Sequence, residues 1–444
     1  MEPVNRTIRA NTQLQLLDRL ALGLLFLFLL GDVLGGAIRY YAVQFHIPWV
    51  SYVPYVLLAC SLVPMFFVYL VSEGVTSTYL QVVVLFGIAT TWGAFNLGRS
   101  DQIGFGLWVC VAFFYGIVLL PAIMRGWRSL TPYVFFLWAL AVAGVFINFF
   151  YSWPWIGLRY QVGATVIEAS RRWTAGALSF SRLPGFSRAS FDVSLQILIP
   201  CIFLAGALRR RWWIPVWVLS AAAIALTTDK TVAAIFILLS IGGALHRKPL
   251  RPFWRYLPLT LAALDILLPF SMLLIKIDWM DALRSHLWIG LFASFLARMQ
   301  VGWPEWLRMI AERGNWFLGR GMGGIGTPQL YFEPTLYSSA DNIAVYLYGV
   351  FGIPGLALLL VYAWNVTRSL GDSLGARFLF LCSCVVLLEG ATSNVMEAPL
   401  LALALGLTLR YFQTASVRAL SYVFKPKKQV QGPVTSGNSQ PQCT

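Results

Sequence analysis

Charge is scarce in this sequence. Only 11% of the 444 residues are charged, whereas soluble globular proteins carry about 25%, and this excludes an ordinary soluble enzyme. Apolar stretches of about 20 residues recur up to residue 411, and each is long enough to cross a hydrocarbon core of about 30 Å as a helix. The stretches are continuous rather than alternating, so they predict an all-α polytopic membrane protein and not a β-barrel.

Residues that hold cofactors are also scarce. The three histidines, His46, His246 and His286, belong to no metal-spacing motif, and the six cysteines include no CxxC pair. The glycine-rich stretch 317–326 lacks the Gly-Lys-Ser/Thr of a P-loop and the strand–helix context of a dinucleotide site. We therefore expect no metal, no other cofactor and no disulfide framework.

Positive charge is plentiful, and its distribution orients the chain. The net charge is +15, but the basic residues recur in alternate short connections, such as the one with Arg125 and Arg128, and in the C-terminal segment that begins at Arg410. This follows the positive-inside rule and argues against nucleic-acid binding. The pattern predicts a multi-pass protein of a bacterial inner membrane with both chain ends in the cytoplasm. We expect about twelve transmembrane helices, over residues 20–42, 53–72, 78–97, 102–123, 130–151, 191–208, 213–228, 230–246, 257–277, 340–364, 376–393 and 396–411.

Two connections are long, 152–190 and 278–339, and both fall on the outer, periplasmic side. They are rich in Trp, Phe, Gly and Arg, so we expect re-entrant or amphipathic pieces, including an interfacial segment over 282–297. Residues 301–313 predict a short helix with one apolar face, formed by Trp303, Trp306, Leu307 and Ile310. The transmembrane domain would cover 1–424 with both loops, and 425–444 reads as a disordered cytoplasmic tail.

Arginines gather in these two outer loops. The first contains five arginines against a single acid, Glu168, and the second contains five arginines against five acids, with hardly any lysine in either. Exposure explains some of them individually, because long loops escape the positive-inside rule. Collectively they indicate an anion site, because the planar guanidinium binds phosphate oxygens in a bidentate manner.

Several basic positions stand in distinctive local contexts. Arg182 and Arg188 flank the turn Pro184-Gly185, and Arg320 lies in the glycine-rich stretch, whose amides can approach a phosphate or sugar closely. Lys230 follows Asp229 in a tight outer hairpin, where it is either part of an interfacial ion pair or a phosphate ligand.

Acidic and amide residues mark the start of the helix expected at 340–364. Asp341-Asn342 is either an ordinary N-cap or, through Asp341, a general base. Glu389, Asn394 and Glu397 are further polar residues near the outer face. Asp265 is an intramembrane acid whose partner the sequence does not name.

Taken in order, these elements resemble the O-antigen ligase and Wzy-type polysaccharide polymerase superfamily. The resemblance runs from about Arg172 to Gly355. The ligases of that superfamily carry a histidine where Asp341 stands, which favours a polymerase. Five elements carry the resemblance, in this order along the chain: Arg182 to Gly185; Thr228 with Lys230; Arg298 followed by Trp303; the turn with Gly319, Gly321 and Gly323; and Asp341-Asn342 before Gly352 and Gly355.

The resemblance implies a GT-C-like membrane glycosyltransferase that uses oligosaccharides linked to undecaprenyl pyrophosphate. Such an enzyme would polymerise repeat units into an exopolysaccharide or O-antigen chain at the periplasmic face, with inversion and without a metal. Catalysis would involve Asp341, Arg298 and Arg182. The pyrophosphate would be bound by Arg182, Arg188, Lys230, Arg298 and Arg320, and the sugar or acceptor by Asn342, Trp303 and Tyr337.

Other functions stay open. A ligase would transfer the chain to lipid A core, and a non-catalytic scaffold would only assemble other proteins. A secondary transporter or a flippase for lipid-linked sugar also suits twelve helices, although the sequence shows no repeat between its halves. If the chain is a polymerase, its surroundings are the lipid bilayer, and the resemblance implies a flippase and a chain-length regulator as partner proteins.

Overall fold

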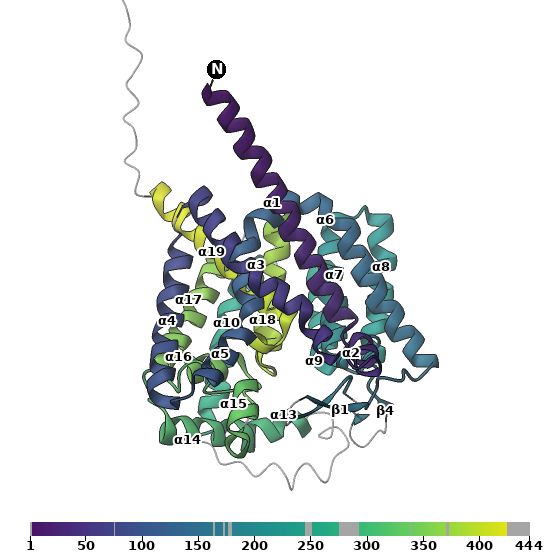
Figure 1. Ribbon diagram of the computed structural model, residues 1–444, viewed down its shortest axis with the longest axis vertical. Coiled ribbons are helices and arrows are strands. Elements are labelled where there is room, and N and C mark those ends of the chain that lie inside the picture. Colours follow the sequence, from purple (N-terminus) through teal and green to yellow (C-terminus); the bar gives the residue numbers. More distant parts are fainter. Residues whose placement is uncertain are drawn as a thin grey trace, which may run out of the picture.

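The computed structural model is a bundle of helices with a layer of short elements at one end (Figure 1). It describes residues 2–74, 76–162, 165–171, 174–175, 180–244, 251–274, 293–337, 339–369 and 373–423. The first helix, α1 (Glu2–Val33), extends beyond the bundle at its N-terminal end. The layer at the opposite end includes β1 (Arg159–Val162), β4 (Phe180–Ser181), α13 (Ala293–Ala297), α14 (Trp303–Arg313) and α15 (Thr327–Phe332). The two long loops therefore share one end of the bundle.

Apolar helices of membrane-spanning length confirm the all-α membrane character. Four stretches within the described residues are long and apolar enough to cross a bilayer, and a bent pair of helices makes a fifth. On α3 (Val53–Glu73), Val63, Phe67 and Val71 recur at helical spacing and are more than half exposed. Such a stripe is stable against lipid rather than water. The four stretches are Pro48–Ser72, Ser77–Leu97, Val111–Phe150 and Ser190–Ala207.

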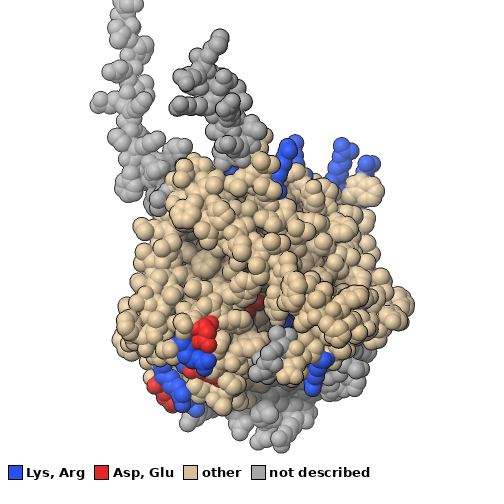
Figure 2. Space-filling model, in the orientation of Figure 1, with Lys and Arg blue, Asp and Glu red and all other residues tan. Residues whose placement is uncertain are grey.

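On the face drawn in Figure 2, the visible charged side chains gather toward the two ends of the molecule. Figure 2 shows Lys and Arg at the end near the N-terminus, and both signs of charge at the end of the two loops, with a broad uncharged band between them. This distribution matches a bundle whose middle lies in hydrocarbon, where charge is costly.

Most of the expected helices each correspond to one helix of the structure. In addition to α3, these are α4 (Ser77–Leu97), α7 (Ser190–Ala207), α8 (Arg210–Thr227), α9 (Lys230–Ala244), α10 (Arg251–Ser271), α18 (Leu374–Gly390) and α19 (Pro399–Val423). The expected disordered tail at 425–444 lies outside the described residues.

Three expected helix boundaries are wrong. The run 20–42 breaks at Leu34 into α1 and α2 (Gly35–Gln44), which meet at 77°. The run 340–364 breaks at Gly352, whose φ of 65° no helix interior allows, into α16 (Ile343–Phe351) and α17 (Ile353–Arg368). The connection expected at 124–129 is helical, inside α6 (Val111–Phe150), and the break falls earlier, after α5 (Ser100–Val109).

Arg125 stays inside α6 because its charge has a partner there. Its Nε and Nη2 donate to the two carboxylate oxygens of Asp18 on α1 at 2.7 and 2.9 Å. The hydroxyl of Tyr69 on α3 donates to the same carboxylate at 2.7 Å. A basic residue that the sequence placed in a loop therefore ties three helices together.

Arg410 was expected with the basic residues at the cytoplasmic end of the last helix, 396–411. It lies within α19, is buried, and donates from Nη1 to the carbonyl oxygens of Ile117 (2.8 Å) and Val118 (3.1 Å) on α6. Pro121 has no N–H and so leaves the carbonyl of Ile117, four residues earlier, without its helical donor. Arg410 replaces that missing hydrogen bond.

The first long loop forms strands, which corrects the expectation of re-entrant or amphipathic pieces. Antiparallel β1 and β2 (Thr165–Glu168) pair Tyr160 with Ile167, and both of these side chains are buried. A second short pair joins β3 (Thr174–Ala175) to β4. The strands lie over a small apolar cluster that includes Trp155 and also contacts α2.

In the second long loop, the helix expected over 301–313 is confirmed as α14. Trp303, Trp306, Leu307 and Ile310 are buried, as its periodicity predicted. A π-helical turn, η4 (Arg298–Gly302), precedes it, and the N–H of Trp303 bonds to the carbonyl of Arg298. Of the interfacial segment expected over 282–297, only α13 is described.

Candidate functional site

Arg298 and Asp341 lie in direct contact. Arg298 Nε donates to Asp341 Oδ2 at 2.8 Å, and the hydroxyl of Ser339 donates to the same oxygen at 3.1 Å. Both charged side chains keep between a quarter and a third of their surface exposed. The turn η4 supplies the arginine, and the stretch before α16 supplies the aspartate. Two of the three residues that the sequence assigned to catalysis are thus brought together.

The Pro184-Gly185 turn fixes the positions of Arg182 and Arg188. Gly185 has a φ of 61°, and its N–H donates to Asn148 Oδ1 of α6 at 3.2 Å. Its carbonyl accepts a hydrogen bond from Trp155 Nε1 at 3.1 Å. A Cβ on Gly185 would lie in tight contact, 3.1 Å from the α6 backbone, and the positive φ also favours glycine at this position.

Arg188 faces a group of acids at the ends of α1 and α7 that lie on the side of the two long loops. Its charge acts on Asp32 and Asp192, and so does the charge of Arg39 on α2. Gln196 Nε2 donates to Asp32 Oδ2 at 2.7 Å, which links α7 to α1. Asp32, Arg39 and Asp192 were not among the residues expected from the sequence.

The hairpin between α8 and α9 brings Arg182 close to Asp229 and Lys230. The charge of Arg182 attracts Asp229 and repels Lys230. Asp229 is buried; its Oδ1 accepts the N–H of Val232 at 3.2 Å and its Oδ2 accepts the hydroxyl of Ser194 at 3.1 Å. Asp229 therefore caps α9, whereas Lys230 is exposed.

Arg171 interacts with acids in two parts of the site, one on α7 and the other between α18 and α19. Its N–H donates to the carbonyl of Arg188 at 2.8 Å. Its charge acts both on Asp192 of α7 and on Glu397, which lies in the turn η6 (Val395–Glu397) between α18 and α19. The charges of Arg298 and Asp229 both act on Glu389.

These residues form one connected group, which we call the outer charged cluster. On the face drawn in Figure 2, an opening among uncharged residues contains acidic and basic atoms. The members are Asp32, Arg39, Arg171, Arg182, Arg188, Asp192, Asp229, Arg298, Asp341, Glu389 and Glu397.

Glu397 ties the cluster to α15. Its two carboxylate oxygens accept the N–H and the hydroxyl of Thr327, both at 2.6 Å. Burial, together with the negative charge of Asp341, raises the pKa of Glu397 above its usual value, although the bonds from Thr327 oppose this. Burial and the same two acids also raise the pKa of the nearby Tyr337, whose side chain is partly exposed.

Several buried polar atoms around the cluster have no hydrogen-bond partner among the described residues. Protein interiors satisfy nearly all such atoms, so a group of orphans indicates room for water or a polar ligand. They include Arg39 Nε, Arg188 Nε, Ser190 Oγ, Thr228 Oγ1, Glu389 Oε2 and Asn394 Nδ2.

Arg320 is engaged elsewhere. It is buried, its Nη1 and Nη2 donate to Glu333 at 3.1 and 3.0 Å, and Nη1 also donates to the carbonyl of Gly324 at 2.7 Å. Burial tends to raise the pKa of Glu333, but the bonds from Arg320 and Gln102 outweigh it and lower the pKa. Gly321 approaches the backbone of Gly93 on α4 so closely that a Cβ would clash. The glycine-rich stretch therefore serves packing.

Asn342 and Trp303 also have roles in helix capping and packing. Asn342 is fully buried and caps α16, since its Oδ1 accepts the N–H of Val345 at 3.0 Å. Trp303 is buried against the ring of Phe295. The capping alternative for Asn342 is thus confirmed, while its proposed contact with a sugar stays a prediction.

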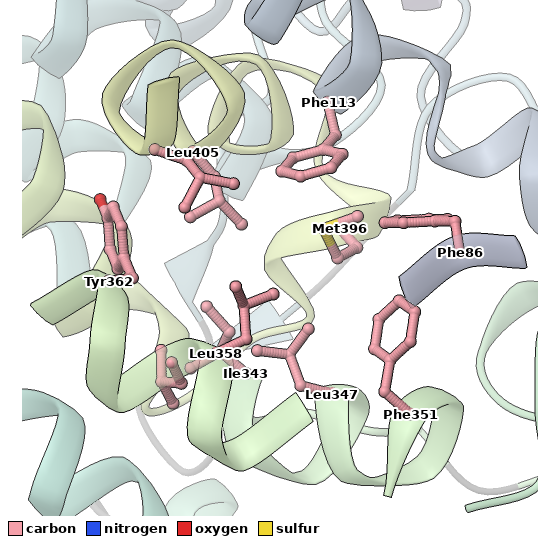
Figure 3. Close-up of a pocket in the computed structure, with 11 residues that line it drawn as sticks. Phe86, Phe113, Ile343, Leu347, Phe351, Leu358, Tyr362, Met396 and Leu405 are labelled. Atoms are coloured by element: carbon pink, nitrogen blue, oxygen red, sulfur yellow. The ribbon is translucent and has the colours of Figure 1, made fainter. Parts of the chain in front are cut away.

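Two cavities in the bundle have apolar linings, and neither is lined by a residue of the cluster. One, of about 20 Å³, is lined by rings and aliphatic side chains such as Phe86, Phe113 and Phe351 (Figure 3). A larger one, of about 110 Å³, lies among α1, α6, α7, α18 and α19. Within the described residues, no three His, Cys, Asp or Glu side chains are grouped to hold a metal ion.

Asp32 and Arg39 escaped the sequence analysis because both fall in a run read as a single spanning helix. A charged residue inside such a run is itself a functional signal, and it could have identified them. Comparison with protein-family models, with curated proteins and with solved structures found no match to this chain.

Proposed function

We propose that this chain is a membrane glycosyltransferase of the polysaccharide polymerase type. It would join oligosaccharide repeat units linked to undecaprenyl pyrophosphate at the outer face of a bacterial inner membrane. The single observation that carries the proposal is the outer charged cluster, in which Arg171 of the first long loop and Asp341, the partner of Arg298 of the second, both act on Glu397.

The chemistry of the donor fits this cluster. In the proposed step, an acceptor hydroxyl attacks the anomeric carbon of the donor sugar, and the bond from that carbon to the pyrophosphate oxygen breaks with inversion. The pyrophosphate leaves with the electron pair and gains negative charge. We assign Arg182, Arg188 and Arg298 to stabilise that charge, which is commonly the largest contribution to catalysis.

Asp341 is the proposed proton acceptor. Arg298 and Ser339 both donate to its Oδ2, so we assign its Oδ1 to the acceptor hydroxyl. The bonds from Arg298 and Ser339 hold the carboxylate in one orientation, which a general base needs. We assign sugar contact to Tyr337, because its side chain is exposed and responds to the charge of Asp341.

The proposed architecture has about twelve spans and a GT-C-like arrangement. In addition to the five apolar spans already described, six more would be formed by α8, α9, α10, the pair α16–α17, α18 and α19. These make eleven, because most of the expected helices 102–123 and 130–151 is joined in α6. Arg320 is better understood as a structural residue, because Glu333 and Gly324 occupy its guanidinium.

A second candidate is a transporter or flippase for the same lipid-linked sugar. Asp32 and Asp192 favour it, because acids in apolar helices commonly lie on transport pathways. The two candidates differ in whether a covalent bond forms.

Reconstitution separates these functions. The purified full chain in liposomes would be incubated with undecaprenyl-pyrophosphate-linked repeat units, without ATP or an ion gradient. A ladder of longer saccharides supports the polymerase, transfer to added lipid A core supports a ligase, and movement across the bilayer without new bonds supports the transporter. Failure to form a ladder with authentic repeat units would overturn the proposal.

A further inference from the structure

The segment that follows α1 runs across the direction of that helix. α2 is turned by 77° from α1, and the bend is held by the N–H groups of Gly36 and Ala37, which donate to the carbonyl of Phe186 at 2.9 and 3.3 Å. After α2, the 3₁₀ turn η1 (Pro48–Tyr52) leads into α3. Residues 35–52 therefore form a connector at the end of the bundle that carries the two loops, not an extension of the span.

The connector has two unlike sides. Tyr40 and Val43 of α2 pack on the apolar cluster under the strands, where the ring of Tyr40 lies 6.2 Å from that of Trp155. The other side carries Tyr41 and Phe45, four residues apart and 53% and 70% exposed. Ile47 and Trp49 extend this side, and they are 39% and 64% exposed.

The chemistry of the exposed side matches a lipid surface. Residues 35–52 contain no Asp, Glu or Lys, and their single arginine, Arg39, has its side chain directed to the carbonyl of Gly35 and to the acids of the outer charged cluster. Trp and Tyr are enriched where a bilayer meets water. The patch also continues onto α3, where Val56 and Leu57 are exposed on an apolar helix of spanning length.

We propose that residues 35–52 dock on the bilayer leaflet at the side of the two loops, with Tyr41, Phe45, Ile47 and Trp49 inserted at the boundary of headgroups and acyl chains. The connector lies along the membrane surface as an amphipathic element does. Because its inner side holds both the strands and Arg39, this docking sets the height of the first loop above the membrane.

Site-directed spin labelling tests the proposal on the full chain. Nitroxides would be attached at Phe45→Cys and Trp49→Cys in a background in which the exposed Cys60 and the tail residue Cys443 are replaced by Ala. The protein would be studied in nanodiscs of phosphatidylcholine and phosphatidylglycerol. Power saturation then compares the accessibility of each label to oxygen, which concentrates in lipid, with its accessibility to a water-soluble nickel chelate.

Two reference labels calibrate the measurement. Val63→Cys on α3 reports the lipid side, and Glu312→Cys, on the exposed charged face of α14, reports water. The proposal predicts oxygen-to-nickel ratios at positions 45 and 49 nearer to that of position 63, several-fold above that of position 312. Ratios nearer to position 312 would overturn it. Low accessibility to both reagents would also overturn it, because it would mean burial against another protein chain.

Discussion

Arg298 and Asp341, 43 residues apart in the sequence, meet through a hydrogen bond of 2.8 Å between Nε and Oδ2. The pair joins a π-helical turn of the second loop to the start of a buried helix. Its surroundings are only partly exposed, so charge–charge interactions are less screened there than on an open surface.

Replacing Arg298 by Ala should abolish polymer and leave lipid-linked repeat units to accumulate. Loss of one electrostatic contact to a leaving group typically costs about 10²–10³ in rate. Arg298→Lys should fail to rescue, because an ammonium has no planar fork. Gel analysis of saccharide length measures the effect, and Arg308→Ala, an exposed arginine of α14, is the matched control. Normal polymer length in Arg298→Ala would contradict the assignment.

Arg182→Ala should have the same phenotype, because the Pro184-Gly185 turn directs Arg182 toward Asp229 and the cluster. Arg159→Ala in the same loop should not, since Arg159 is exposed and pairs with Glu168 on the neighbouring strand at 3.0 Å. The same gel assay compares them. Equal activity of the two variants would remove Arg182 from the proposed pyrophosphate site.

Arg410 and Pro121 should behave as a coupled pair in stability measurements. Arg410→Met leaves the carbonyl of Ile117 without a donor, which should cost about 1–3 kcal/mol. Pro121→Ala supplies an N–H that can bond to that carbonyl, so the double variant should be less destabilised than the sum of the singles. Thermal unfolding in detergent measures all three. Strict additivity would refute the coupling.

Gly352→Ala should destabilise the protein by more than about 2 kcal/mol, because its φ is positive and a Cβ would collide with the carbonyl of Phe317. Gly87→Ala is the matched control. Gly87 lies inside α4 with open space around it, so alanine there should be neutral or stabilising by up to about 1 kcal/mol. If both variants unfold at the same temperature, the account of Gly352 is wrong.

The Arg320–Glu333 pair should make the stability of the folded protein depend on pH. The pKa of Glu333 is lowered in the folded protein, so its contribution to stability is present above the ordinary glutamate pKa. It is lost as the pH falls through the folded-state pKa. Melting temperature measured from pH 7 down to pH 3 should therefore fall less steeply in Glu333→Gln than in the wild-type protein. An unchanged slope would show that Glu333 does not contribute.

Hydropathy and periodicity predicted much of the fold, because they report burial directly. The apolar face of α14 followed from spacing alone, as did most helices of the bundle. The break at Leu34 could not be predicted, because the hydrogen bonds to Phe186 that hold it come from about 150 residues away. The strands of the first loop escaped for a related reason, since their apolar cluster is completed by α2.

The sequence predicted which types of residue form the candidate site, but it did not predict all of the individual residues that meet there. The excess of arginine in two loops indicated an anion site, and Arg298 with Asp341 was anticipated on the family resemblance. Asp32, Arg39 and Asp192 join the cluster only through the packing of α1, α2 and α7. Arg320 and Arg410 show the opposite case, where a basic residue serves packing.

The π-helical turn Arg298–Gly302 has an evolutionary consequence. Turns of this kind arise when one residue is inserted into an α-helix, and each residue rotates a helix by about 100°. Deleting a single residue between Met299 and Gly302 would restore regular winding and swing Arg298 away from Asp341, with α14 still in place. Related chains should therefore keep the number of residues between Arg298 and Trp303 even where the residues themselves differ.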